Sequence, residues 1–142
     1  GYVKINSKNI HEPPIINPNY LSDPYDVDVL LKSIRIGRNF LSTSPLQPYL
    51  NGQANPSNDL QTDDELLSWA RNEGITVYHM IGTAKMGPKS DKMAVVNNEL
   101  QVRGIESLRV ADASIMPAMP SGNTNAPTMM IAEKASDMIL GK

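Results

Sequence analysis

The sequence predicts an α+β protein with a mixed sheet and flanking helices, for three reasons. Short segments with the two-residue alternation of strands occur near the start and in the second half of the chain. Three segments have apolar residues at helical spacing or residues typical of helix ends. The two kinds of segment are interspersed without a regular βαβ order or an internal repeat. With 142 residues the chain suits one domain, 1–142.

The chain opens with the alternating residues 2–6, Tyr2-Val3-Lys4-Ile5-Asn6. This pattern predicts a short strand with one buried face. Residues 12–18 follow, and their three prolines favour extended backbone because proline fixes φ and restricts the residue before it.

A first helix is expected from Pro24. Asp23 suits the N-cap, Pro24 the first helical position, and Asp26 the positive end of the helix dipole. Apolar residues recur at helical spacing and predict one packed face; they are Val27, Leu30, Leu31, Ile34 and Leu41. Residues 44–61, rich in Pro, Asn, Gln, Ser and Gly, read as a loop.

A second helix is expected after Thr62, which forms a capping-box pattern with Glu65. Its inward positions would be Leu66, Leu67 and Ala70, and Gly74 would end it.

Residues 75–81 form a β-rich run that carries His79, followed by a loop over 82–92. Short strands are expected near 94–96, 100–102 and 108–110. A third helix should begin near Ala126 and Pro127, run to Ile139 and end before Gly141.

The composition argues against several classes of function. The net charge is −2 and the 13 Lys and Arg form no run, so nucleic acid is not an expected partner. There is no cysteine, which excludes disulfides and thiolate metal sites. The two histidines lack the HExxH spacing, so no metal site is predicted. No apolar stretch approaches the roughly 20 residues of a membrane span, and the start, which lacks Met, has no signal-peptide pattern.

His79 is the first candidate for chemistry. Histidine exchanges protons near neutral pH and often serves as a general base, although a buried strand histidine would give the same pattern. Gly82, just after it, would allow another backbone or a ligand to approach closely. The other histidine, His11, is expected to face solvent.

The second candidate is the polar loop over residues 114–127, which leads into the third helix. Helix N-termini present unpaired N–H groups that suit an anion or an electron-rich ring edge. Simple capping by Thr124 or Asn125 explains the same residues. Asp112, at the end of a predicted strand, would on spacing alone cap the following turn.

Together these segments resemble the carboxyl-terminal region of the glucose-methanol-choline (GMC) flavoprotein oxidoreductases, over nearly the whole chain. The resemblance lies in several motifs that occur in the family's order: 1–3 with 13–21, 78–87 around the histidine, 108–117, and 121–128.

The resemblance implies FAD-dependent oxidation of an alcohol CH–OH group, with hydride transfer to flavin N5. His79 matches the catalytic histidine that accepts the hydroxyl proton, and Asn123 matches its partner position, where an amide can hold the alcohol oxygen. Asp112, Ala113, Asn125 and Pro127 match positions that contact FAD.

No G-x-G-x-x-G occurs among the nine glycines, so the motif that seats the FAD pyrophosphate is absent. The chain is therefore expected to be a fragment: part of the substrate cap, plus the last strand and helix of the FAD-binding part. Its partners would be a small-molecule alcohol and the missing amino-terminal FAD-binding part, and alone it should not turn over. An FAD-containing hydroxynitrile lyase of the same fold and a non-catalytic α+β interaction module remain as alternatives.

Overall fold

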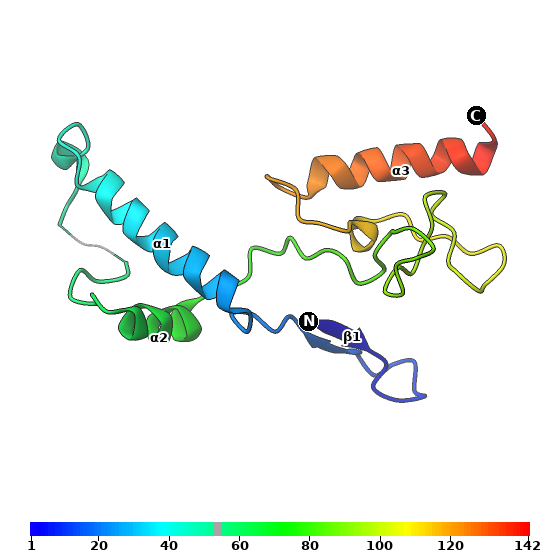
Figure 1. The fold of residues 1–142 in the computed structure, drawn as a ribbon, viewed down its shortest axis with the longest axis horizontal. Helices are drawn as coiled ribbons and strands as arrows, with labels where there is room; N and C mark the ends of the chain where they lie inside the picture. Colours follow the sequence, from blue (N-terminus) through cyan, green and yellow to red (C-terminus); the bar gives the residue numbers. More distant parts are fainter. Residues whose placement is uncertain (53–54) are drawn as a thin grey trace. The chain divides into compact units, whose positions relative to one another are not determined.

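The computed structural model describes residues 1–52 and 55–142, which group into two compact units, 1–75 and 76–142. Residues 53 and 54 of the expected loop lie outside the described part. In chain order the elements are two strands, a long helix, a short 3₁₀ helix, a second helix, another short 3₁₀ helix and a final helix (Figure 1).

The expected first strand is present as β1 (Tyr2–Lys4), and the proline-rich segment contains β2 (Ile15–Asn17). The two pair antiparallel, with Val3 opposite Ile16. The prediction of a buried face is wrong, since Val3 is 49% and Ile16 56% exposed. A ribbon of two strands has too little area to enclose either of its faces.

Helix α1 (Pro24–Leu41) begins where the sequence predicts. The Asp23 carboxylate accepts a hydrogen bond from the Tyr25 N–H at 2.9 Å, and Pro24 opens the first turn. Leu31 is buried at the centre of the expected apolar face, whereas Leu41, in the last turn, is exposed. The packed face is therefore shorter than the spacing predicts.

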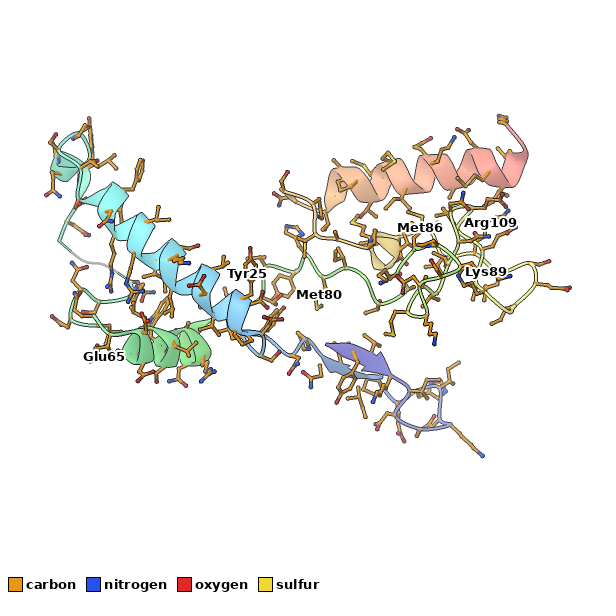
Figure 2. The ribbon with its side chains drawn as sticks, viewed as in Figure 1. Tyr25, Glu65, Met80, Met86, Lys89 and Arg109 are labelled. Carbon is orange, nitrogen blue, oxygen red and sulfur yellow. The ribbon has the colours of Figure 1, made fainter. Side chains whose placement is uncertain are left out.

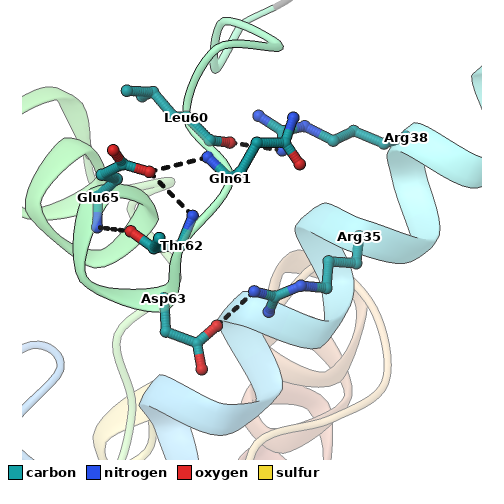
Figure 3. Close-up of polar contacts among 7 residues, drawn as sticks. All are labelled: Arg35, Arg38, Leu60, Gln61, Thr62, Asp63 and Glu65. Atoms are coloured by element: carbon teal, nitrogen blue, oxygen red, sulfur yellow. Dashed lines mark hydrogen bonds and ion pairs between the residues drawn. The ribbon is translucent and has the colours of Figure 1, made fainter.

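Helix α2 (Asp63–Glu73) packs against α1 and buries Leu66 and Ala70. Its capping box is complete (Figure 3). The Thr62 hydroxyl accepts from the Glu65 N–H at 3.3 Å, and the Glu65 carboxylate accepts from the N–H groups of Thr62 and Gln61, both at 2.9 Å. These bonds satisfy amides that the helix itself leaves unpaired.

Two arginines of α1 hold the segment that leads into α2 (Figure 3). Arg38 donates to the carbonyl oxygens of Leu60 at 2.8 Å and Ser57 at 2.7 Å, and Arg35 forms an ion pair with Asp63. The short 3₁₀ helix η1 (Gln47–Tyr49) lies within the expected loop.

The expected strand over residues 75–81 is not formed, which corrects that prediction. The Thr76 hydroxyl accepts a hydrogen bond from the Tyr78 N–H at 3.1 Å, and Tyr78 adopts a left-handed φ of 61°. Such local side-chain bonds compete with strand pairing, and a residue at positive φ breaks the two-residue alternation.

The strands expected near 94–96, 100–102 and 108–110 appear only as single bridges. Met86 bridges Val96 in parallel fashion, while Val96 with Val102 and Gln101 with Arg109 are antiparallel. With the antiparallel β1–β2 ribbon these make the strand pairing mixed, and the predicted α+β class is confirmed.

Helix α3 (Asn125–Leu140) ends at Gly141, whose φ of 67° gives the left-handed C-cap. It packs against the 3₁₀ helix η2 (Ala113–Ile115). The core of this unit brings together residues of α3, η2 and the bridged turns: Val96, Leu100, Ile115, Met116, Ile131 and Ala135. Among the described helices none is both long and apolar enough for a bilayer span.

Candidate functional site

The structure brings His79 and Asn123 into direct contact within the second unit. The Asn123 side-chain nitrogen, Nδ2, lies 2.8 Å from His79 Nε2, and Thr124 Oγ1 lies 3.0 Å from His79 Nδ1. Both ring nitrogens therefore have a side-chain partner, and both partners precede α3. His79 is half-buried, Asn123 exposed and Thr124 buried.

The segments on either side of this contact are anchored to one another. The Ala84 and Met86 N–H groups donate to the carbonyl oxygens of Ser114 and Ile115, at 2.9 and 2.8 Å. Met86 lies in the segment after His79, beside η2 (Figure 2), and its side chain packs on the core. The loop that carries His79 is thus fixed to the segment that leads toward Asn123.

Positive-φ residues flank the histidine. Tyr78, immediately before it, is held at φ 61°, and Gly82 at φ 83°. A Cβ at Gly82 would lie 3.4 Å from the Met116 carbonyl oxygen, an ordinary van der Waals contact, so the left-handed φ favours glycine here more than the space around it does. Left-handed conformations in non-glycine residues are uncommon and concentrate at functional sites.

The donor and acceptor roles in the Asn123–His79 contact depend on the tautomer of the imidazole. An amide –NH2 group only donates hydrogen bonds, so with Nδ2 facing the ring, Nε2 accepts and the ring proton lies on Nδ1. In that tautomer Nε2 has the lone pair that a general base needs. The pair can take up a proton at Nε2 and offer an N–H donor to an oxygen beside it.

Asp112 is the N-cap of η2, and its carboxylate accepts from the Ser114 N–H at 2.7 Å. The capping role expected from spacing is therefore confirmed. Ala113 is partly buried and packs against the core. Neither residue has a direct hydrogen bond to His79 or Asn123 among those that the structure describes.

Asn125 and Pro127 lie in the first turn of α3, two and four residues after Asn123. Thr124 occupies the N-cap position, but in the described structure no side chain caps this helix, and its first turn has no acidic residue. Uncapped N–H groups at a helix N-terminus suit an electron-rich ring edge such as that of a flavin. The residues present thus fit a flavin at this end of α3.

Within residues 1–52 and 55–142, no group of three or more histidine or acidic side chains is placed to hold a metal ion.

Comparison with known proteins identifies the family of this chain. The family model described as GMC oxidoreductase matches residues 1–132. An oxygen-dependent choline dehydrogenase of Staphylococcus aureus (strain JH9) is 46% identical over 143 residues, covering all of this chain and 25% of the relative.

Two solved structures have the same fold. An FAD-dependent oxidoreductase from Chaetomium thermophilum matches 98% of this chain and 24% of its own, with a TM-score of 0.87 and 32% identity. A fungal aryl-alcohol oxidase matches 98% of this chain and 23% of its own, with a TM-score of 0.85 and 31% identity.

The fold is that of a class of flavoprotein oxidoreductases. This chain is a member of the GMC oxidoreductase family, and its similarity extends through the carboxyl-terminal region that the sequence motifs indicated. It spans about a quarter of the length of the curated relatives it matches. The name of the Chaetomium thermophilum relative includes FAD, which agrees with the expected cofactor.

One site residue was missed by sequence reasoning. Thr124 was considered only as a helix cap, yet its hydroxyl contacts His79 instead. A threonine before a helix is typical of a cap, and no pattern in the sequence indicates that its hydroxyl points elsewhere.

Proposed function

We propose that this chain supplies the base and the oxygen-binding amide of an FAD-dependent enzyme that oxidises an alcohol CH–OH group to an aldehyde or ketone. The observation that carries the proposal is the 2.8 Å contact between Asn123 Nδ2 and His79 Nε2. It supports the proposal because it pairs an imidazole nitrogen that can accept a proton with an amide that can donate a hydrogen bond, in a chain of a family with alcohol-oxidising members.

His79 Nε2 takes the proton of the substrate hydroxyl, and the Asn123 amide donates a hydrogen bond to the oxygen as negative charge grows on it. FAD, when bound, supplies the acceptor for the hydride that leaves the carbon. The alcohol thus loses one proton to His79 and one hydride, and its C–O bond becomes C=O.

The contact between the two side chains also sets a condition on substrate binding. In the proposed arrangement, the lone pair of His79 Nε2 accepts a hydrogen bond from the Asn123 amide nitrogen, Nδ2. An alcohol has to replace that hydrogen bond with its own O–H, while the amide turns to the alcohol oxygen. Because Asn123 is exposed at the end of a loop, its side chain has room for this small movement.

We assign contacts with the flavin to the residues before and at the start of α3, namely Asp112, Ala113, Asn125 and Pro127. The uncapped N-terminus of α3 supports this for Asn125, whereas Pro127 has no N–H group and is assigned from the resemblance alone. The chain contains no glycine fingerprint, so the pyrophosphate of FAD would be held by an amino-terminal part of the enzyme. The coverage of about a quarter of each relative supports such a partner.

The test is anaerobic flavin reduction by alcohol in the full-length enzyme that carries this chain. His79→Ala should slow reduction by roughly 10²–10⁴-fold, the usual contribution of a general base. His11→Ala is the matched control, because His11 is exposed and remote in sequence, and it should reduce at the normal rate.

A near-normal rate in His79→Ala would contradict the assignment of the base. If the wild-type flavin is not bleached by alcohols but a cyanohydrin is cleaved, the enzyme is a lyase of the same fold. Absence of both flavin and activity in the full-length protein would instead indicate a non-catalytic module.

A further inference from the structure

We infer that Thr124 is a positioning residue that holds His79 in the tautomer protonated on Nδ1, so that Nε2 keeps the lone pair for catalysis. This inference rests on the proposed function, because it concerns the base of that reaction. It adds a residue that lies on the far side of the ring from Asn123.

The contact is direct, and its threonine side is buried. Thr124 Oγ1 lies 3.0 Å from His79 Nδ1, and Thr124 is 8% exposed, the one buried polar residue among those described. A buried polar group is costly to leave unpaired, so the Thr124 hydroxyl needs a partner such as this imidazole nitrogen.

The backbone of Thr124 is fixed by α3. Its carbonyl oxygen accepts hydrogen bonds from the N–H of Thr128 at 3.0 Å and from the Thr128 hydroxyl at 2.6 Å. The hydroxyl is thus presented to His79 from the N-cap position of a helix of 16 residues. A β-branched side chain has few χ1 rotamers, which further limits where the hydroxyl can point.

The hydroxyl is diverted from its usual role. Threonine at an N-cap position ordinarily accepts a hydrogen bond from the second or third amide of the helix. Thr124 occupies that position without such a bond, and its Oγ1 faces the imidazole.

Two proton arrangements of the ring can satisfy both partners, because the contacts themselves do not fix the tautomer. In the arrangement that we infer, the Asn123 amide donates to Nε2, and Nδ1 carries the ring proton and donates it to Thr124 Oγ1. With the opposite arrangement, Thr124 would donate to Nδ1 and the Asn123 oxygen would accept from Nε2–H. That arrangement would leave no lone pair toward the substrate.

The test uses the full-length enzyme with Thr124→Val, which replaces the hydroxyl by a methyl group of similar size, and Thr124→Ser, which keeps the hydroxyl. Nitrogen NMR of labelled histidine reads which ring nitrogen is protonated, independently of turnover. Stopped-flow measurement of flavin reduction at several alcohol concentrations gives two separate quantities: the limiting rate of reduction and the half-saturating alcohol concentration.

In the wild type, His79 should be protonated on Nδ1 with Nε2 bare. Thr124→Val should show a mixture of tautomers and a limiting rate about 10–100-fold lower, the usual effect of removing a group that orients a functional side chain. The half-saturating alcohol concentration should change little. Thr124→Ser should restore both the tautomer and most of the rate.

Protonation of His79 on Nε2 in the wild type would overturn the inference, even if Thr124→Val does not fold. A Thr124→Val enzyme with the normal rate, beside a slow His79→Ala enzyme, would overturn this inference alone. Failure of the proposed function is distinguished from it, because His79→Ala would then also reduce normally.

Discussion

His79 and Asn123 are 44 residues apart in the chain, yet their side chains are hydrogen-bonded through Nε2 and Nδ2. The backbone N–H groups of Ala84 and Met86 donate hydrogen bonds to carbonyl oxygens of η2, and these bonds bring together the loops that carry His79 and Asn123. Because the anchoring bonds are backbone bonds, the pair is positioned by the fold as well as by its own contact. The consequences for activity and stability can each be measured.

Removal of the Asn123 amide should weaken binding of the developing alkoxide. In the full-length enzyme, Asn123→Ala should lower the rate of flavin reduction by roughly 10²–10³-fold, the range found when one such donor is removed. Asn98, exposed in a turn, provides the matched control, and Asn98→Ala should leave the rate unchanged. Equal rates in both variants would show that Asn123 does not contact the reacting oxygen.

Gly82 should be sensitive to a side chain. Gly82→Ala forces a Cβ into left-handed backbone near the Met116 carbonyl, and local stability should fall by about 1–2 kcal/mol. Hydrogen exchange at the amides of Ala84 and Met86 measures this opening directly. Faster exchange is expected at both.

Gly37 provides the opposite case. It lies inside α1 with nothing near its would-be Cβ, so Gly37→Ala should strengthen that helix by about 0.5–1 kcal/mol. Slower hydrogen exchange of the α1 amides would confirm this prediction. Faster exchange in Gly37→Ala would contradict it, because the added methyl group would then weaken the helix.

The capping box of α2 should make that helix sensitive to acid. Hydrogen bonds from the N–H groups of Thr62 and Gln61, and from the Thr62 side chain, hold the pKa of Glu65 below its ordinary value of 4.5. A carboxyl whose pKa is lower in the folded state stabilises the fold above the ordinary value. This contribution is lost as the pH falls through the lowered pKa.

NMR titration of the Glu65 carboxyl should therefore give a midpoint below 4.5. Protection of α2 amides should be greater in the wild type than in Glu65→Gln near neutral pH, and the difference should vanish in acid. A difference that persisted at low pH would mean that the ionised carboxylate is not what stabilises the helix end.

The helix starts could be predicted from sequence because they depend on neighbouring residues. Asp23 with Pro24, and Thr62 with Glu65, make bonds within a few positions of each other, and both helices begin as expected. The positions of His79 and Asn123 were expected from resemblance to a family. Their separation in the chain gives no local signal that they touch.

The segment around Val77 shows why strands are harder to predict. Its β-branched and aromatic residues favour extended backbone, but a strand also requires a partner, and the described residues provide none there. The Thr76–Tyr78 hydrogen bond turns the chain instead. The same applies near Val96 and Val102, where pairing stops at single bridges.

We propose that His79 and Asn123 act as one unit on the alcohol oxygen. Rates of flavin reduction in the wild type, His79→Ala, Asn123→Ala and the double variant test it most directly, since residues that act as a unit are strongly non-additive. The double variant should reduce about as slowly as His79→Ala alone. A double variant slowed by the full product of the two single effects would contradict the claim.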